Sequence, residues 1–134
     1  MNTILVTGAS GFVAEHLIPI LRQAGNRVIG VDRKEQPSAA CDEYIQSELS
    51  RLAFNDIRDH AAVPDVIIHL AAARADWGVS DAEFYEDNVE ATAALLNQFE
   101  GRPLKRFIFV SSIYTFFKRV FKFPLFQHLF CYTG

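Results

Sequence analysis

The chain has 134 residues, of which 50% are hydrophobic, and a formal net charge of −3. This length supports one globular domain with a buried core, and the acidic balance argues against nucleic-acid binding, which needs clustered Lys and Arg. No stretch reaches the roughly 20 apolar residues of a membrane-spanning helix. The apolar start is too short for an export signal, so we expect a cytoplasmic protein. Cys41 and Cys131 lack ligand-like spacing and predict reduced thiols rather than a metal site, with a single disulfide as the alternative.

The first third of the chain alternates strand-like and helix-like segments. Residues 3–7 (TILVT) predict a short β-strand. Residues 12–24 carry apolar side chains at helical spacing and are followed by Gly25, a typical residue after a helix end. Pro19 lies inside this segment and is expected to kink the helix. Residues 27–32 (RVIGVD) predict the second strand.

The middle of the chain is less regular. Residues 34–40 are polar and contain a proline, which predicts a loop, and residues 52–54 predict a weak third strand. Residues 66–70 (VIIHL) predict a buried strand. A serine–glutamate capping box opens a predicted helix between residues 80 and 101, and a glycine ends it. Residues 106–111 (RFIFVS) predict the last strand.

The predicted strands are continuous apolar runs, which is typical of a parallel sheet covered by helices on both faces. We therefore predict an α/β fold, a Rossmann-type doubly wound sheet in the order 3-2-1-4-5, truncated after about the fifth strand. Residues 1–113 would form this incomplete domain. Residues 114–134 contain half of the 12 Phe and no acidic residue, so we interpret them as an atypical tail outside it.

The strongest functional motif is a glycine turn between the first strand and the first helix. Gly8 and Gly11 lack a Cβ, so the backbone can turn tightly and a pyrophosphate can approach the helix N-terminus. Asp32 ends the second strand, where a carboxylate binds the adenosine ribose and repels a 2′-phosphate. NAD is thus favoured over NADP, although Arg33 and Lys34 moderate the preference. A tight packing turn beside a solvated aspartate is the alternative.

These motifs resemble the extended short-chain dehydrogenase/reductase family, the NAD-dependent epimerases and dehydratases of nucleotide sugars. Thr7, Gly8 and Gly11 match its T-G-x-x-G-x-x-G pattern, with Ala14 at the third glycine. The resemblance implies a cofactor-binding set that spans the first hundred residues. This set is Gly8, Ser10, Gly11, Phe12, Val13, Asp32, Arg33, Asp56, Ile57, Leu70, Ala71, Ala72 and Asn88.

Individual roles follow from the resemblance. Asp56 and Ile57 would contact adenine, residues 69–72 match the family's H-x-A-A segment beside the cofactor, and Asn88 would brace the neighbouring strand. Ser112 matches the family's catalytic serine, which hydrogen-bonds substrate. Taken singly, each match has a structural alternative: a core histidine, an exposed helix residue or the end of a strand.

The catalytic Tyr-x-x-x-Lys of the family has no convincing match. Tyr114 and Lys118 have the right spacing, but they follow Ser112 too closely to lie on a separate helix. We therefore expect an NAD-binding fragment with little or no turnover alone, from a truncated or frameshifted gene. The alternatives are an active enzyme completed by another chain and a nucleotide-sensing or interaction protein. We expect a nucleotide sugar as a further ligand and self-association through an unpaired sheet edge; membrane-surface binding of the tail is a weaker alternative.

Overall fold

The computed structural model describes residues 1–60, 63–73, 78 and 80–111. Ser112, Tyr114, Lys118 and the predicted tail lie outside the described residues. No helix within these ranges is long and apolar enough to cross a membrane. The elements are β1 (Thr3–Thr7), α1 (Phe12–Gln23), β2 (Arg27–Asp32), β3 (Glu43–Gln46), the 3₁₀ turn η1 (Leu49–Arg51), α2 (Phe54–His60), β4 (Val66–His69), α3 (Asp81–Tyr85), the π-helical turn η2 (Glu86–Glu90), α4 (Ala91–Gln98) and β5 (Arg106–Phe109).

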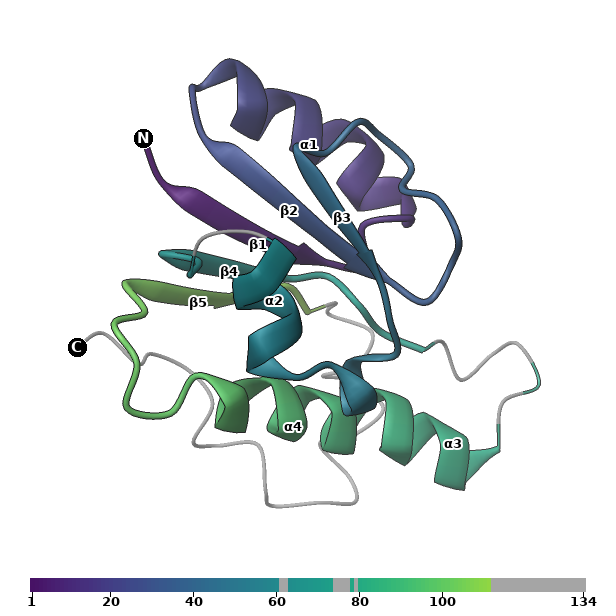
Figure 1. Cartoon of the computed structure of the whole chain (residues 1–134). Coiled ribbons are helices and arrows are strands. Elements are labelled where there is room, and N and C mark those ends of the chain that lie inside the picture. Colours follow the sequence, from purple (N-terminus) through teal and green to yellow (C-terminus); the bar gives the residue numbers. More distant parts are fainter. Residues whose placement is uncertain (61–62, 74–77, 79, 112–134) are drawn as a thin grey trace.

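The strands form one parallel sheet in the order β3-β2-β1-β4-β5, as the sequence predicts. β1 lies at its centre, and Leu5 pairs with Ile29 on β2 and with Ile67 on β4. The carboxyl ends of the strands therefore meet at one edge of the sheet (Figure 1). In such folds ligands bind outside this edge, where the strand order reverses.

Helices cover both faces of the sheet, because successive side chains of a strand point to opposite faces. α1 packs on one face, and α2 and α4 pack on the other (Figure 1). Each face has its own apolar core. The first is Ile4, Val6, Ala9, Ala14, Ile18, Val28 and Ile68. The second is Leu5, Ile29, Val31, Ile45, Leu52, Phe54, Ile57, Ile67, Leu95 and Phe99.

The predicted third strand at residues 52–54 is wrong. The third strand is β3, which begins nine residues earlier, and residues 54–60 form α2 instead. Phe54 and Ile57 lie one helical turn apart, so both side chains reach the core from the same side of α2. The alternation of Leu52 and Phe54 thus reflects the entry into a helix, not a strand.

The predicted long helix is present but contains an extra residue. Ser80 and Glu83 form the expected capping box, and Gly101 follows the helix end with a φ of +69°. Between them η2 widens the helix by a π turn, so the buried face shifts along the sequence. Tyr85, directly before this turn, is 52% exposed, whereas Thr92, directly after it in α4, is buried.

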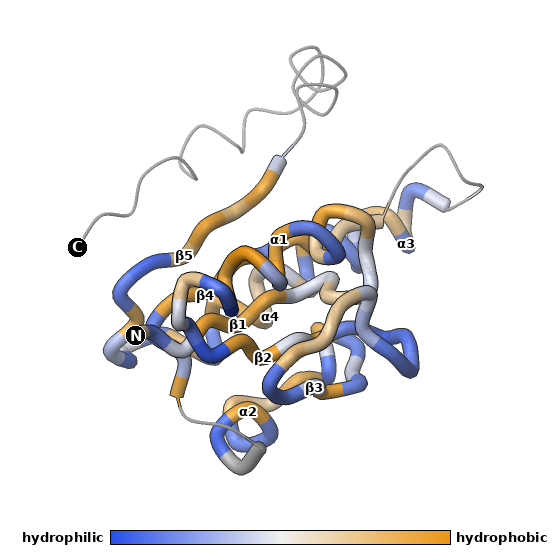
Figure 2. Tube along the Cα trace, turned by 90° about the horizontal axis from the view of Figure 1, so that it is seen from above, coloured by the Kyte–Doolittle hydropathy of each residue, from blue (hydrophilic) through white to orange (hydrophobic). Residues whose placement is uncertain are grey.

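β5 is the outer strand of the sheet among the described residues and pairs only with β4 there. Phe107 packs partly against the core beneath α4. Ile108, Phe109 and Val110 are more than 40% exposed although all three are apolar. Figure 2 shows this apolar segment at one end of the sheet.

Candidate functional site

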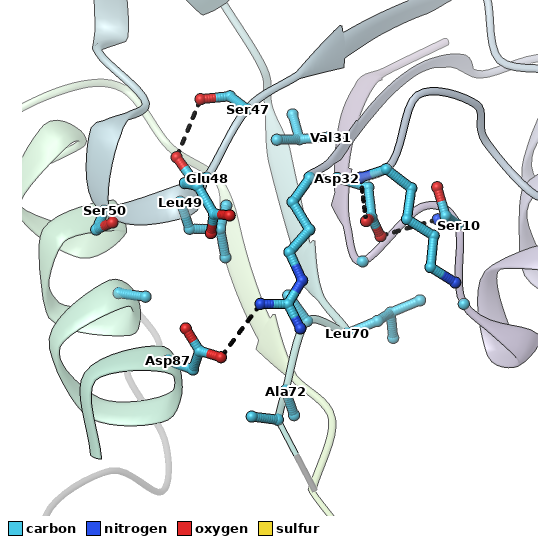
Figure 3. Close-up of a pocket in the computed structure, with 17 residues that line it drawn as sticks. Ser10, Val31, Asp32, Ser47, Glu48, Leu49, Ser50, Leu70, Ala72 and Asp87 are labelled. Carbon is cyan, nitrogen blue, oxygen red and sulfur yellow. Dashed lines mark hydrogen bonds and ion pairs between the residues drawn. The ribbon is translucent and has the colours of Figure 1, made fainter. Parts of the chain in front are cut away.

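A cleft of about 280 Å³ opens at the carboxyl ends of the strands (Figure 3). Four segments form its walls: the glycine turn after β1, the end of β2, the segment after β3 and the segment after β4; η2 and the start of α4 complete it. The lining residues are Gly8, Ser10, Gly11, Val31, Asp32, Arg33, Lys34, Ser47, Glu48, Leu49, Ser50, Leu70, Ala71, Ala72, Ala73, Asp87 and Ala91.

The glycine turn touches the segment after β4 directly. Gly8 has a φ of +71°, and a Cβ there would lie 2.7 Å from the Ala71 nitrogen. Gly11 is the N-cap of α1 and provides no side chain to cap the helix. The N-terminus of α1 is thus positioned for an anion. The side chains of Phe12 and Val13 are exposed and do not line the cleft, so their backbone N–H groups are the candidate contacts.

Asp32 holds the glycine turn and the loop after β2 at the same time. Its Oδ2 accepts a hydrogen bond from the Ser10 N–H at 3.1 Å, and its Oδ1 accepts one from the Lys34 N–H at 3.0 Å. A carboxylate has about four acceptor positions, so two remain for ribose hydroxyls. The sequence signal, an acid at the end of the second strand, therefore identified a residue on the cleft wall.

Ser10 contributes shape rather than free donors. Its backbone N–H is bonded to Asp32. Its hydroxyl donates to the Gln36 carbonyl and also lies within hydrogen-bond distance of the Tyr44 hydroxyl. Ser38 donates its hydroxyl to the Ala9 carbonyl at 2.9 Å. The loop after β2 therefore braces the glycine turn from behind.

Arg33 extends from the end of β2 across the cleft to η2. Its Nη1 lies 3.4 Å from Oδ2 of Asp87, shown by the dashed line at Asp87 in Figure 3. Both side chains are partly exposed, so this ion pair adds little to stability. It does hold the guanidinium away from the Asp32 side of the cleft.

A leucine and small residues form the wall after β4. Leu70, Ala71 and Ala72, three residues of the predicted cofactor set, line the cleft. Asn88 does not line it but bonds the backbone of Ala73 twice: Oδ1 accepts from the Ala73 N–H at 3.0 Å, and Nδ2 donates to the Ala73 carbonyl at 3.2 Å. Asn88 thus braces the continuation of β4, in the manner that the resemblance implies.

A buried polar chain runs behind this wall. Thr7 Oγ1 lies 2.6 Å from His69 Nδ1, and His69 Nε2 lies 2.9 Å from Thr92 Oγ1. His69 is 1% exposed, and burial lowers its pKa from 6.5 to about 4, so the imidazole is neutral at physiological pH. His69 does not line the cleft.

Asp56 and Ile57 do not line the cleft either. Ile57 is fully buried in the core, and Asp56 Oδ2 accepts from the Ala53 N–H at 2.9 Å, which caps the start of α2. The acid–aliphatic pair that lines the cleft is Glu48–Leu49, directly after β3. This pair was not predicted, because the third strand was expected at residues 52–54; an acid following a correctly placed β3 is the signal that identifies it.

These features define a class: a Rossmann-type domain with an open cleft at the switch point of its sheet. A model of the NAD-dependent epimerase/dehydratase family matches residues 4–120. The chain belongs to this family.

Relatives and solved structures agree with this assignment. The chain is 30% identical over 125 residues to UDP-glucose 4-epimerase of Halalkalibacterium halodurans, covering 84% of this chain and 35% of the relative. It superposes on UDP-glucose 4-epimerase of Thermotoga maritima, solved with UDP-glucose, with a TM-score of 0.72 and 26% identity over 82% of this chain and 38% of that one. MoeE5, solved with UDP-glucose and NAD, gives a TM-score of 0.68 at 31% identity over 82% and 36% of the two chains. The chain spans about a third of the length of these relatives.

Proposed function

We propose that this chain binds NAD in the cleft between the glycine turn and the ends of β2, β3 and β4. The single observation that carries the proposal is the pairing of an uncapped helix N-terminus at Gly11 with a carboxylate, Asp32, beside it in the same cleft. The first suits a pyrophosphate and the second suits ribose hydroxyls. Solved relatives that hold NAD in the same fold support this choice of ligand.

Within the cleft, the adenosine half would lie toward Asp32 and Glu48. Glu48 offers a carboxylate as hydrogen-bond acceptor and Leu49 an apolar surface, the two features that an adenine ring needs from a wall. The small residues at 70–73 would leave room for the remainder of the dinucleotide. No described residue is assigned to proton transfer.

A nucleotide sugar is the proposed second ligand, since UDP-glucose is bound in two of the similar structures. We propose that the 134-residue chain alone does not convert it. Tyr114 follows Ser112 too closely in the sequence to occupy the separate helix that the family's tyrosine requires. Conversion of UDP-glucose that disappears in Tyr114→Phe would contradict this.

Titration calorimetry with NAD tests the cofactor site directly. Gly11→Val places a side chain where the pyrophosphate would lie, and we expect the affinity to fall roughly tenfold or more. The φ of Gly11 is −88°, so the substitution does not force a left-handed backbone.

Gly25→Ala is the matched control. This glycine follows the other end of α1 with a φ of +80°, so alanine there costs about 1 kcal/mol of stability without approaching the cleft. Equal NAD affinity in Gly11→Val and the unchanged chain would rule out the glycine turn as the pyrophosphate site.

A further inference from the structure

The buried chain from Thr7 to Asn88 has only one consistent arrangement of protons. Thr92 Oγ1 lies 2.6 Å from the Asn88 carbonyl, which can only accept, so the single Thr92 hydroxyl proton points there. Thr92 must then accept from His69, 2.9 Å away. The proton of the neutral imidazole is therefore on Nε2.

The hydrogen bonds on the Thr7 side of His69 agree with this tautomer. With its proton on Nε2, His69 accepts at Nδ1 from the Thr7 hydroxyl at 2.6 Å. Thr7 Oγ1 in turn accepts from the Ala71 N–H at 3.4 Å. Every donor then meets an acceptor, and Thr7, His69 and Thr92 are all buried, so no water is needed to complete the chain.

This series of hydrogen bonds connects three walls of the cleft. Thr7 immediately precedes Gly8 of the glycine turn, Ala71 lies on the wall after β4, and Asn88 belongs to η2. Asn88 extends the connection through its two bonds to Ala73. His69 hydrogen-bonds both Thr7 and Thr92 and so joins the two ends.

We propose that His69, fixed as its Nε2–H tautomer, is a positioning residue that holds residues 70–73 against the glycine turn in the geometry that binds the dinucleotide. The proposal rests on NAD as the ligand of the cleft. His69 acts through Thr7 and Thr92 and does not itself touch the ligand.

Thr92 gives the test, because it lies outside the cleft lining. Thr92→Val keeps the volume but removes the hydroxyl, which leaves His69 Nε2–H without an acceptor. We expect NAD affinity to fall about tenfold, the equivalent of one well-formed hydrogen bond to a buried group. Thr92→Ser restores the hydroxyl and should restore the affinity. Thr3→Val, the same change at the start of β1 and away from the cleft, is the control and should bind as the unchanged chain does.

A tautomer measurement separates positioning from general stability. In a long-range ¹H–¹⁵N spectrum of the unchanged chain, we expect His69 Nε2 to be protonated and Nδ1 unprotonated, and this needs no variant to fold. In Thr92→Val we expect the protonation pattern of the two His69 ring nitrogens to change and the Ala71 and Ala73 amide signals to shift. Thr92→Ser should reverse both changes.

A proton on Nδ1 in the unchanged chain, or unchanged affinity and amide signals in Thr92→Val, would overturn the positioning role. Should the chain show the expected tautomer and amide shifts but bind no NAD, the positioning of residues 70–73 is supported, and only the proposed cofactor fails.

Discussion

We expect cofactor choice to depend on two aspartates rather than one. Asp32 would repel the 2′-phosphate of NADP, and Asp87 pairs with Arg33, which with Lys34 is one of two cations on the cleft lining that could attract that phosphate. Removing Asp32 alone would therefore leave Arg33 paired with Asp87. We expect these charges together to set the preference.

We predict that Asp32→Ala narrows the ratio of NAD to NADP affinity about tenfold, through loss of repulsion. The double variant Asp32→Ala with Asp87→Asn should narrow it further, because Arg33 is released. Calorimetric titrations of both nucleotides measure the ratio. Asp87→Asn alone is the control, since Asp32 still repels the phosphate; a constant ratio across all three variants would show that the ribose is recognised elsewhere.

Burial of His69 predicts a pH dependence of stability. The folded pKa of about 4 lies below the ordinary 6.5, so the unfolded chain takes up the proton first as the pH falls. Stability is therefore complete above about pH 6.5 and declines from there to about pH 4. Between about pH 7 and about pH 5 we expect a loss of about 2 kcal/mol in the free energy of unfolding.

Urea unfolding at several pH values measures this loss, and the NMR titration of each histidine identifies its source. A folded-state titration of His69 near its ordinary value would contradict the predicted dependence.

At the scale of elements, β3 brings a different segment to the cleft from the one that the sequence suggested. β3 ends at Gln46, and residues 47–50 continue into the cleft wall. The Asp56 carboxylate is instead used at the start of α2. The two acids therefore have separable effects.

We predict that Glu48→Gln lowers NAD affinity about three- to tenfold with little change in melting temperature, through loss of a charged acceptor. Asp56→Ala should do the reverse: it removes the cap of α2 and costs about 1 kcal/mol of stability, with unchanged affinity. Calorimetry and thermal unfolding of the two variants decide. A loss of NAD affinity in Asp56→Ala, with unchanged affinity in Glu48→Gln, would indicate that Asp56 and not Glu48 contacts adenine.

The sequence predicted four of the five strands, the strand order and about half of the residues that line the cleft, because those depend on local signals. Apolar runs mark β1, β2, β4 and β5, and glycines mark the turn. β3 was missed because it has four residues with one buried side chain, Ile45, between polar neighbours. The Arg33–Asp87 pair and the His69 chain depend on contacts between residues far apart in sequence, which no local pattern encodes.

At the scale of the whole molecule, the two ends of the sheet differ. β5 presents the exposed apolar side chains Ile108, Phe109 and Val110, and its outer edge pairs with no other strand in the described part of the chain. Unpaired strand edges with apolar side chains promote pairing with other chains. We therefore expect self-association at this edge of the sheet.

We predict that the chain self-associates in sedimentation experiments and that Ile108→Lys reduces the association by placing a charge on the exposed strand. Ile20→Lys is the matched control, since Ile20 is also exposed but lies on α1. Deletion of residues 114–134 should increase the association. A soluble monomer after the deletion would show that the edge of β5 does not drive it.

The central place of β1 has a consequence for how the chain is made. The ribosome releases the chain from its N-terminus, so β1, α1 and β2 can assemble early. The second edge of β1, however, belongs to β4, which is synthesised only after the β3 and α2 segments. Until then the strand that will become the centre of the sheet has an unpaired edge in the nascent protein, and unpaired edges of this kind make a partly folded chain prone to aggregation.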